Sequence, residues 1–144
     1  MGVAGVKGFG GGFAGACVSE FGEPETKAFA RHASEAAARL RQAMADIDGA
    51  DLRIALTHYS PVRDTLRGEP PELYPFLGSY LLAEAIDGAG ADLAVHGHAH
   101  HGTERGTTPG GIRVRNVAQP VIGSAYRLYE LHPRAGRPVA SAAP

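Results

Sequence analysis

The chain is poor in the features that mark secreted, membrane-spanning or nucleic-acid-binding proteins. Its 144 residues include one cysteine, Cys17, so no internal disulfide framework is available and nothing points to secretion. No apolar run approaches the ~20 residues of a membrane span, and residues 1–18 lack the sustained apolar segment of a signal peptide. Fourteen basic and fifteen acidic residues leave a net charge of −1, which gives no electrostatic reason to expect nucleic acid or a membrane surface as a partner. We therefore expect a cytoplasmic protein.

The rest of the composition is that of an ordinary globular protein. Hydrophobic residues make up 44% and charged residues 20% of the chain, so it should bury a core. Its length suits one domain over residues 1–144. The final stretch, 133–144, is rich in alanine, proline and glycine and is expected to be a disordered tail.

Hydrophobic periodicity predicts alternating strands and helices. The expected elements, in chain order, are a weak strand over 3–6, a helix over 24–48, strand 52–56, a short helix over 80–87, and strands over 93–95, 112–117 and 125–131. The glycine-rich residues 7–13 lack the G-K-[S/T] of a phosphate loop and are expected to form a flexible connector. This order predicts an α/β fold in which helices cover a sheet.

Histidines gather where two of the expected strands end. His58 follows strand 52–56, and four of the seven histidines lie between 96 and 101, directly after strand 93–95. In open α/β sheets, ligands sit beyond the carboxyl ends of the strands, so neighbouring parallel strands would bring these groups together. In an extended segment His98 and His100 project to the same side. Because imidazole is the commonest neutral ligand for divalent metals, the pattern predicts a metal site.

Two segments resemble motifs of the calcineurin-like metallophosphoesterases. Residues 56–61, L-T-H-Y-S-P, look like that family's strand-end histidine motif, and residues 95–100, V-H-G-H-A-H, contain its G-H-x-H motif. Residues 111–117, G-I-R-V-R-N-V, resemble the strand that follows, and the resemblance covers roughly residues 1–131. It implies a sandwich-type fold with a sheet flanked by helices. It also implies that metal-activated water hydrolyses a phosphate ester, in a small molecule or a phosphorylated substrate.

The same resemblance implies roles for individual residues. His58 and His98 would bind one metal and His100 a second, with manganese, iron or zinc as the ions that suit imidazole. His96 and His101 are expected to be supporting groups. No residue is assigned as the catalytic acid or base. Tyr59 and Arg63 lie in the long polar loop after His58 and are candidates for contact with substrate, since arginine suits a phosphate.

The earlier motifs of the family are missing. No D-x-H, G-D-x-x-D or G-N-H-D/E occurs, and the one asparagine, Asn116, lies after G-H-x-H. The chain therefore resembles only the carboxyl-terminal half of the domain, with the amino-terminal strands expected to be missing. A truncated gene, a misplaced start codon or a separate chain that supplies the other half would each explain this. An uncovered sheet edge or apolar face is then expected.

Two other functions stay open at this point. One is a non-catalytic remnant that binds one metal or none. The other is an unrelated mononuclear metal hydrolase that uses the same three histidines. The missing carboxylates favour the remnant, because a hydrolase still needs a general base.

Overall fold

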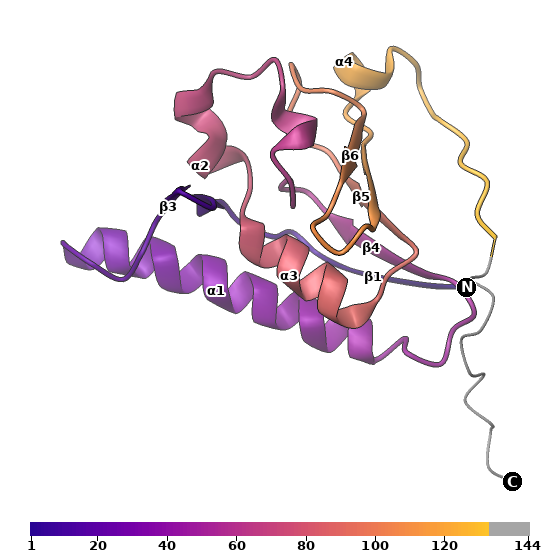
Figure 1. Cartoon of the computed structure of the whole chain (residues 1–144), viewed down its shortest axis with the longest axis horizontal. Helices are drawn as coiled ribbons and strands as arrows, with labels where there is room; N and C mark the ends of the chain where they lie inside the picture. The colour runs from indigo at the N-terminus through magenta and orange to yellow at the C-terminus, as the bar shows by residue number, and fades with distance from the viewer. Residues whose placement is uncertain (133–144) are drawn as a thin grey trace, which may run out of the picture.

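A computed structural model describes residues 1–132, and the structural statements below concern that range; the expected tail, 133–144, lies outside it. The elements in chain order are β1 (Gly2–Val6), β2 (Gly12–Phe13), β3 (Ala16–Cys17), α1 (Pro24–Ala45), β4 (Arg53–Thr57), η1 (Asp64–Leu66), η2 (Pro71–Leu73), α2 (Tyr74–Leu77), α3 (Tyr80–Ala89), β5 (Leu93–His96), β6 (Arg105–Thr107), β7 (Arg113–Asn116) and α4 (Gln119–Ile122). Figure 1 shows how they are arranged. No helix in this range is both long and apolar enough to cross a bilayer.

A five-stranded mixed sheet forms the centre of the fold. Its strand order is β1-β4-β5-β7-β6, and β2 and β3 form a separate antiparallel pair. The first four strands pair in parallel, whereas β6 runs antiparallel to β7. Leu56 of β4 is in register with Val95 of β5, so the expected parallel pairing of these two strands is confirmed. Their carboxyl ends therefore lie side by side, as the metal-site prediction requires.

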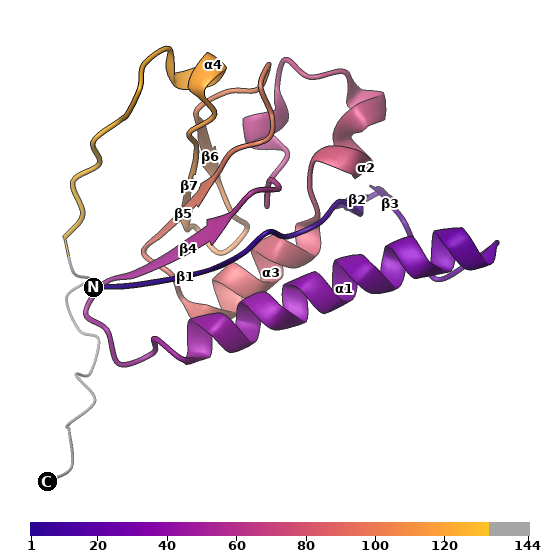
Figure 2. The same cartoon turned by 180° about the vertical axis from the view of Figure 1, so that it is seen from behind.

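Helices α1 and α3 pack against each other and cover one face of the sheet (Figures 1 and 2). Pro24 and Glu25 stand in the first turn of α1, where a fixed φ and an acidic side chain both favour a helix start. The side chain of Ser79 caps α3 by accepting a hydrogen bond from the Leu81 amide at 3.3 Å. The core between helices and sheet includes Leu40, Met44, Leu82, Ile86, Ala4, Ala55, Ala94 and Val114.

The opposite face of β1 and β4 carries apolar side chains that remain accessible. Side chains alternate between the two faces along a strand, so Ala4 and Ala55 are buried whereas Val3 is 53% and Leu56 47% exposed. Parallel strands are usually covered on both faces. Strand β1 also stands at the end of the sheet order, with no strand on its outer side among residues 1–132. The expected uncovered face and edge are thus present in the described residues.

The prediction of a strand over 125–131 is wrong. Helix α4 ends at Ile122, Gly123 caps it with a φ of 63°, and residues 124–132 are irregular but lie against the sheet, with the Arg115 guanidinium of β7 5.8 Å from the centre of the Tyr129 ring. The Tyr129 hydroxyl in this segment donates to Glu104 at 3.0 Å. The edge position belongs instead to β6, whose sequence R-G-T has no apolar alternation from which a strand could be predicted.

The glycine-rich segment is packed rather than flexible. Its Gly11 amide donates to the Pro75 carbonyl at 2.7 Å and its Gly12 amide to the Gly78 carbonyl at 2.9 Å. A side chain at Gly10 would collide with the Pro75 carbonyl, so glycine is needed for this close approach. The prediction of a flexible connector over 7–13 is therefore wrong, because the absence of side chains here allows the backbone to approach α2.

Candidate functional site

Three adjacent parallel strands bring Lys7, His58 and His98 to the same edge of the sheet. His58 comes directly after β4, and His98 comes two residues after β5 ends. The His58 and His98 rings lie with their centroids 4.6 Å apart and their planes tilted by 46°. The Lys7 carbonyl, just past β1, accepts hydrogen bonds from the amides of His58 (2.9 Å) and Tyr59 (3.2 Å). Strand geometry, rather than sequence proximity, thus pairs the two histidines.

Tyr59 packs beside both histidines. Its ring centroid is 4.5 Å from that of His98 and 5.6 Å from that of His58. On its other sides are the ring of Phe9, 5.8 Å between centroids, and the ammonium group of Lys7, 5.9 Å from the Tyr59 centroid. Tyr59 therefore forms one wall of the candidate site.

His98 occupies a strained tight turn. It is the one non-glycine residue with positive φ among residues 1–132, at 69°. The Ala99 amide donates to the Gly97 carbonyl at 2.8 Å, which closes a γ-turn with His98 at its centre. A positive-φ turn of this kind is rare and costs roughly 1–3 kcal/mol at a non-glycine residue. Strain of this kind persists where the surrounding structure holds it, and it clusters at functional sites.

Hydrogen bonds from three directions hold the turn and the residues after it. The Asn116 amide group donates to the Ala99 carbonyl at 2.7 Å. The buried carboxylate of Glu69 accepts from the His101 amide at 2.8 Å. The Thr65 carbonyl accepts from the Thr103 amide at 3.1 Å. These three hydrogen bonds restrain the loop and so maintain the strained backbone conformation of His98.

The sequence carries only a faint signal for these holding residues. Asn116 stands out as the one asparagine and occurs at a strand end. Thr65 and Glu69 lie in a proline-rich polar stretch whose long-range partners no periodicity reveals.

His96 is engaged within the fold by both of its ring nitrogens. Nδ1 lies 2.7 Å from the Gly97 carbonyl and Nε2 lies 2.8 Å from the Thr65 hydroxyl. The side chain is fully buried. Burial disfavours the imidazolium form and lowers the pKa of His96 to about 4. His96 is therefore neutral at pH 7, and neither nitrogen is free for an external ligand.

The neighbours that shift the pKa of His58 are basic side chains. Its pKa is lowered from the ordinary value, first by burial and then by repulsion from His98, Lys7 and His100. No carboxylate contributes to this shift. The ring is consequently neutral at pH 7, which is the form that binds a metal. Among these neighbours the Lys7 ammonium is a cation, and it favours a negatively charged ligand beside the histidines.

Within residues 1–132, the structure brings two histidines together but does not form a complete metal centre. Among residues 1–132, no three histidine, cysteine, aspartate or glutamate side chains converge as a group that could hold an ion. His100 is exposed and acts on His58 electrostatically. His101 is also exposed, and its backbone amide is bonded to Glu69.

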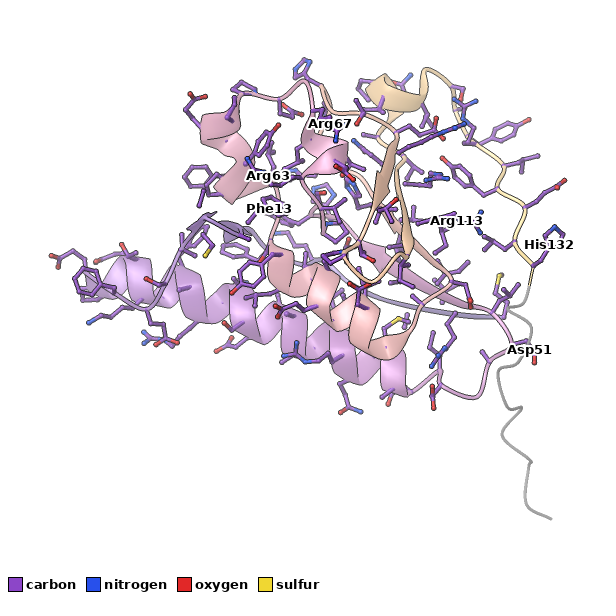
Figure 3. The ribbon with its side chains drawn as sticks, in the orientation of Figure 1. Phe13, Asp51, Arg63, Arg67, Arg113 and His132 are labelled. Atoms are coloured by element: carbon purple, nitrogen blue, oxygen red, sulfur yellow. The ribbon has the colours of Figure 1, made fainter. Side chains whose placement is uncertain are left out.

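Arg63 is not brought to the histidine pair. Its guanidinium lies 5.8 Å from the centre of the Tyr74 ring. Together with Phe13 it lines a cleft of about 460 Å³ between β2, η1 and α3, and no histidine lines this cleft. Figure 3 shows Phe13 and Arg63 close together above the start of α3, with Arg67 higher in the view. Of the two residues expected to contact substrate, only Tyr59 stands beside the histidines.

No family model matches the chain, and no curated protein and no solved structure is significantly similar to it. The functional argument therefore rests on the residues and their geometry.

Proposed function

We propose that this chain carries the histidine part of a metal-dependent phosphoesterase centre, as the carboxyl-terminal part of a calcineurin-like metallophosphoesterase domain. The observation that carries the proposal is the pairing of His58 and His98, 4.6 Å apart between ring centroids, at the ends of adjacent parallel strands. The strained conformation of His98 supports it, because such strain is typical of functional sites. The substrate is a phosphate ester, and a cytoplasmic location is part of the proposal.

The residues present fit one ion better than two. His58 and His98 would hold a manganese, iron or zinc ion, because neutral imidazoles suit these metals. His100 is the proposed third ligand, and because it is exposed and not grouped with the pair among residues 1–132, its side chain would turn toward them on binding. When bound, the ion would lower the pKa of water and so supply a hydroxide nucleophile. Two ions do not fit, since Lys7 and the imidazoles leave their repulsion without a carboxylate to offset it. Lys7 and Tyr59 would orient the phosphate beside the histidines.

The missing carboxylates would come from a further polypeptide segment. Exposed Val3 and Leu56, together with the open edge of β1, offer a surface on which such a segment could pack. It would be either an upstream extension of this chain or a second chain. The complete site would then contain two ions.

A second function is favoured by the same electrostatics. Because no carboxylate contributes to the pKa shift of His58, the chain could be a non-catalytic remnant that binds one metal or none. This alternative predicts no turnover under any condition, including in the presence of the missing half.

The first test is metal binding by the chain alone, measured by titration calorimetry with zinc and with manganese. Replacing His58 or His98 by alanine should weaken binding at least tenfold. His101→Ala is the matched control and should change it less than twofold, because the His101 side chain is exposed and its bond to Glu69 is made by the backbone amide. Equal losses in His98→Ala and His101→Ala would contradict the assignment.

The second test is hydrolysis of p-nitrophenyl phosphate and its bis ester. The chain alone should turn over poorly with added manganese, and adding the upstream half, in cis or as a second chain, should restore activity. His98→Ala should abolish the restored activity. Strong metal-dependent turnover by the chain alone would instead favour a mononuclear metal hydrolase. Absence of turnover in the presence of the upstream half would favour the remnant.

A further inference from the structure

We propose that Thr65 and His96 are positioning residues that fix the His58 segment relative to the His98 segment through a buried hydrogen-bond chain. The effect on metal binding rests on the proposed function, but the effect on the distance between the two histidines does not. Neither residue contacts the site directly. Both act through the residues that they hold.

The chain of hydrogen bonds connects the two strand ends. The Ser60 hydroxyl, two residues after His58, lies 2.8 Å from the Thr65 hydroxyl. The Thr65 hydroxyl lies 2.8 Å from Nε2 of His96, two residues before His98. All three side chains are fully buried. Water therefore does not compete for these bonds, and removing one partner leaves another buried group unsatisfied.

The positions of the protons determine which group donates in each of these hydrogen bonds. Nδ1 of His96 faces the Gly97 carbonyl at 2.7 Å, and a carbonyl only accepts, so Nδ1 carries the ring proton. In the neutral ring Nε2 is then an acceptor, and the Thr65 hydroxyl donates to it. The Ser60 hydroxyl is left to donate to Thr65 or to the Val62 carbonyl, 2.8 Å away. Each hydroxyl proton therefore has an acceptor, and the bond from Thr65 to His96 runs in one direction.

Thr65 also holds the far end of the histidine loop. Its carbonyl accepts from the Thr103 amide at 3.1 Å, while its hydroxyl binds His96 at the near end. Gly102 packs so closely on the Thr65 carbonyl that a side chain there would collide with it. One residue of η1 therefore contacts both ends of the segment that carries His98 and His100. Loss of the Thr65 hydroxyl should therefore loosen the end of the loop at His96 and leave the end at Thr103 in place.

The experiment compares Thr65→Val, which removes the hydroxyl at constant shape, with Thr65→Ser, which keeps it. The matched control is Thr108→Val. Thr108 is also a buried threonine. Its hydroxyl accepts from the Ile112 amide at 2.9 Å and donates to Asp87 of α3, and neither partner belongs to the histidine loop. Two readouts are used: the nuclear Overhauser effect between the His58 and His98 ring protons in metal-free protein, and zinc affinity by calorimetry.

We expect Thr65→Val to lose most of the ring-to-ring signal and to bind zinc about tenfold more weakly. Thr65→Ser should retain the signal and bind zinc within threefold of the wild type. Thr108→Val should melt earlier but keep both properties. An undiminished ring-to-ring signal in folded Thr65→Val, or an equal loss in Thr108→Val, would overturn the inference.

The outcomes separate this inference from the proposed function. If wild-type protein binds no zinc but Thr65→Val still loses the ring-to-ring signal, the metal proposal fails and the positioning role stands. If Thr65→Val does not fold, the ring tautomer of His96 in wild-type protein decides, read from its nitrogen-15 resonances. A proton on Nδ1 with a bare Nε2 is expected, and a proton on Nε2 would overturn the inference.

Discussion

The side-chain amide of Asn116 donates to the carbonyl of Ala99 across 2.7 Å, tying the end of β7 to the residue between the two histidines of G-H-x-H. The Asn116 side-chain oxygen accepts from the Ala118 amide at 3.1 Å. One fully buried side chain thus links the histidine loop, β7 and the start of α4.

Replacing Asn116 by leucine should destabilise the protein by about 1–3 kcal/mol, because the Ala99 carbonyl and the Ala118 amide lose their partner in the interior. Urea denaturation measures the loss. Gln119→Ala, a neighbouring exposed position, is the control and should change stability by less than about 0.5 kcal/mol. Similar stability of the Asn116→Leu and Gln119→Ala variants would show that the link contributes little.

The strained turn predicts an unusual order of stability among His98 variants. Glycine adopts positive φ without penalty, so His98→Gly should be more stable than His98→Ala by about 1 kcal/mol in urea denaturation. Both variants should lose metal binding equally, since both lack the imidazole. At His100, whose φ is not positive, the order should reverse, with alanine the more stable replacement. The same order at both positions would contradict a strained His98.

Burial of neutral His96 predicts a loss of stability in acid. Its pKa is about 4 in the fold and about 6.5 in the unfolded chain, so below pH 6.5 the unfolded state takes up a proton that the folded state does not. The free energy of unfolding should therefore fall between pH 6.5 and 4, by as much as about 3 kcal/mol. His58, whose pKa is also lowered, adds to the same slope.

The measurement is chemical denaturation of the protein in chelator at a series of pH values. His96→Gln should flatten the slope, although it lowers stability at neutral pH. His101→Gln, at an exposed position, should leave the slope unchanged. An equally steep slope in the His96→Gln variant would mean that other groups cause the acid sensitivity.

The accessible face of β1 and β4 predicts that Leu56 contributes little to the stability of the isolated chain. Leu56→Gln should cost less than about 0.5 kcal/mol and should reduce binding of a hydrophobic dye. Leu82→Ala, in the buried core, should cost about 2–5 kcal/mol. Comparable losses at Leu56 and Leu82 would indicate that the face is covered in solution, for instance by self-association, which sedimentation would reveal.

The sequence predicts the elements whose hydrophobic pattern is strong. The helix expected over 24–48 is observed as α1 from Pro24 to Ala45, and the strands before and within the histidine motifs are observed as β4 and β5. Residues 125–131 show why apolar content alone misleads. That stretch contains strand-forming residues, but it contacts the sheet through side chains such as Tyr129 against Arg115 and pairs with no strand.

The part of the site that depends on strand topology could be predicted from the sequence. The part that depends on side-chain contacts could not. Parallel strand ends alone bring His58 to His98. The γ-turn at His98 and the buried bond from Thr65 to His96 depend on partners far apart in sequence, within segments that have no regular pattern. Arg63 shows the converse, since a residue close to His58 in sequence lies against Tyr74 instead.

The parallel order of β1, β4, β5 and β7 has a consequence for how the protein reaches its native state. Every neighbouring pair in this ladder is separated by a crossover, so β1 meets β4 only after the whole of α1 has been traversed. Contacts this distant along the chain carry a large entropic cost and slow folding. A folding intermediate that has formed α1 but not the parallel strand pairs would therefore contain the helix, while His58 and His98 would still be apart. During refolding, the approach of His58 to His98 would report the pairing of β4 with β5, which a helix signal alone would miss.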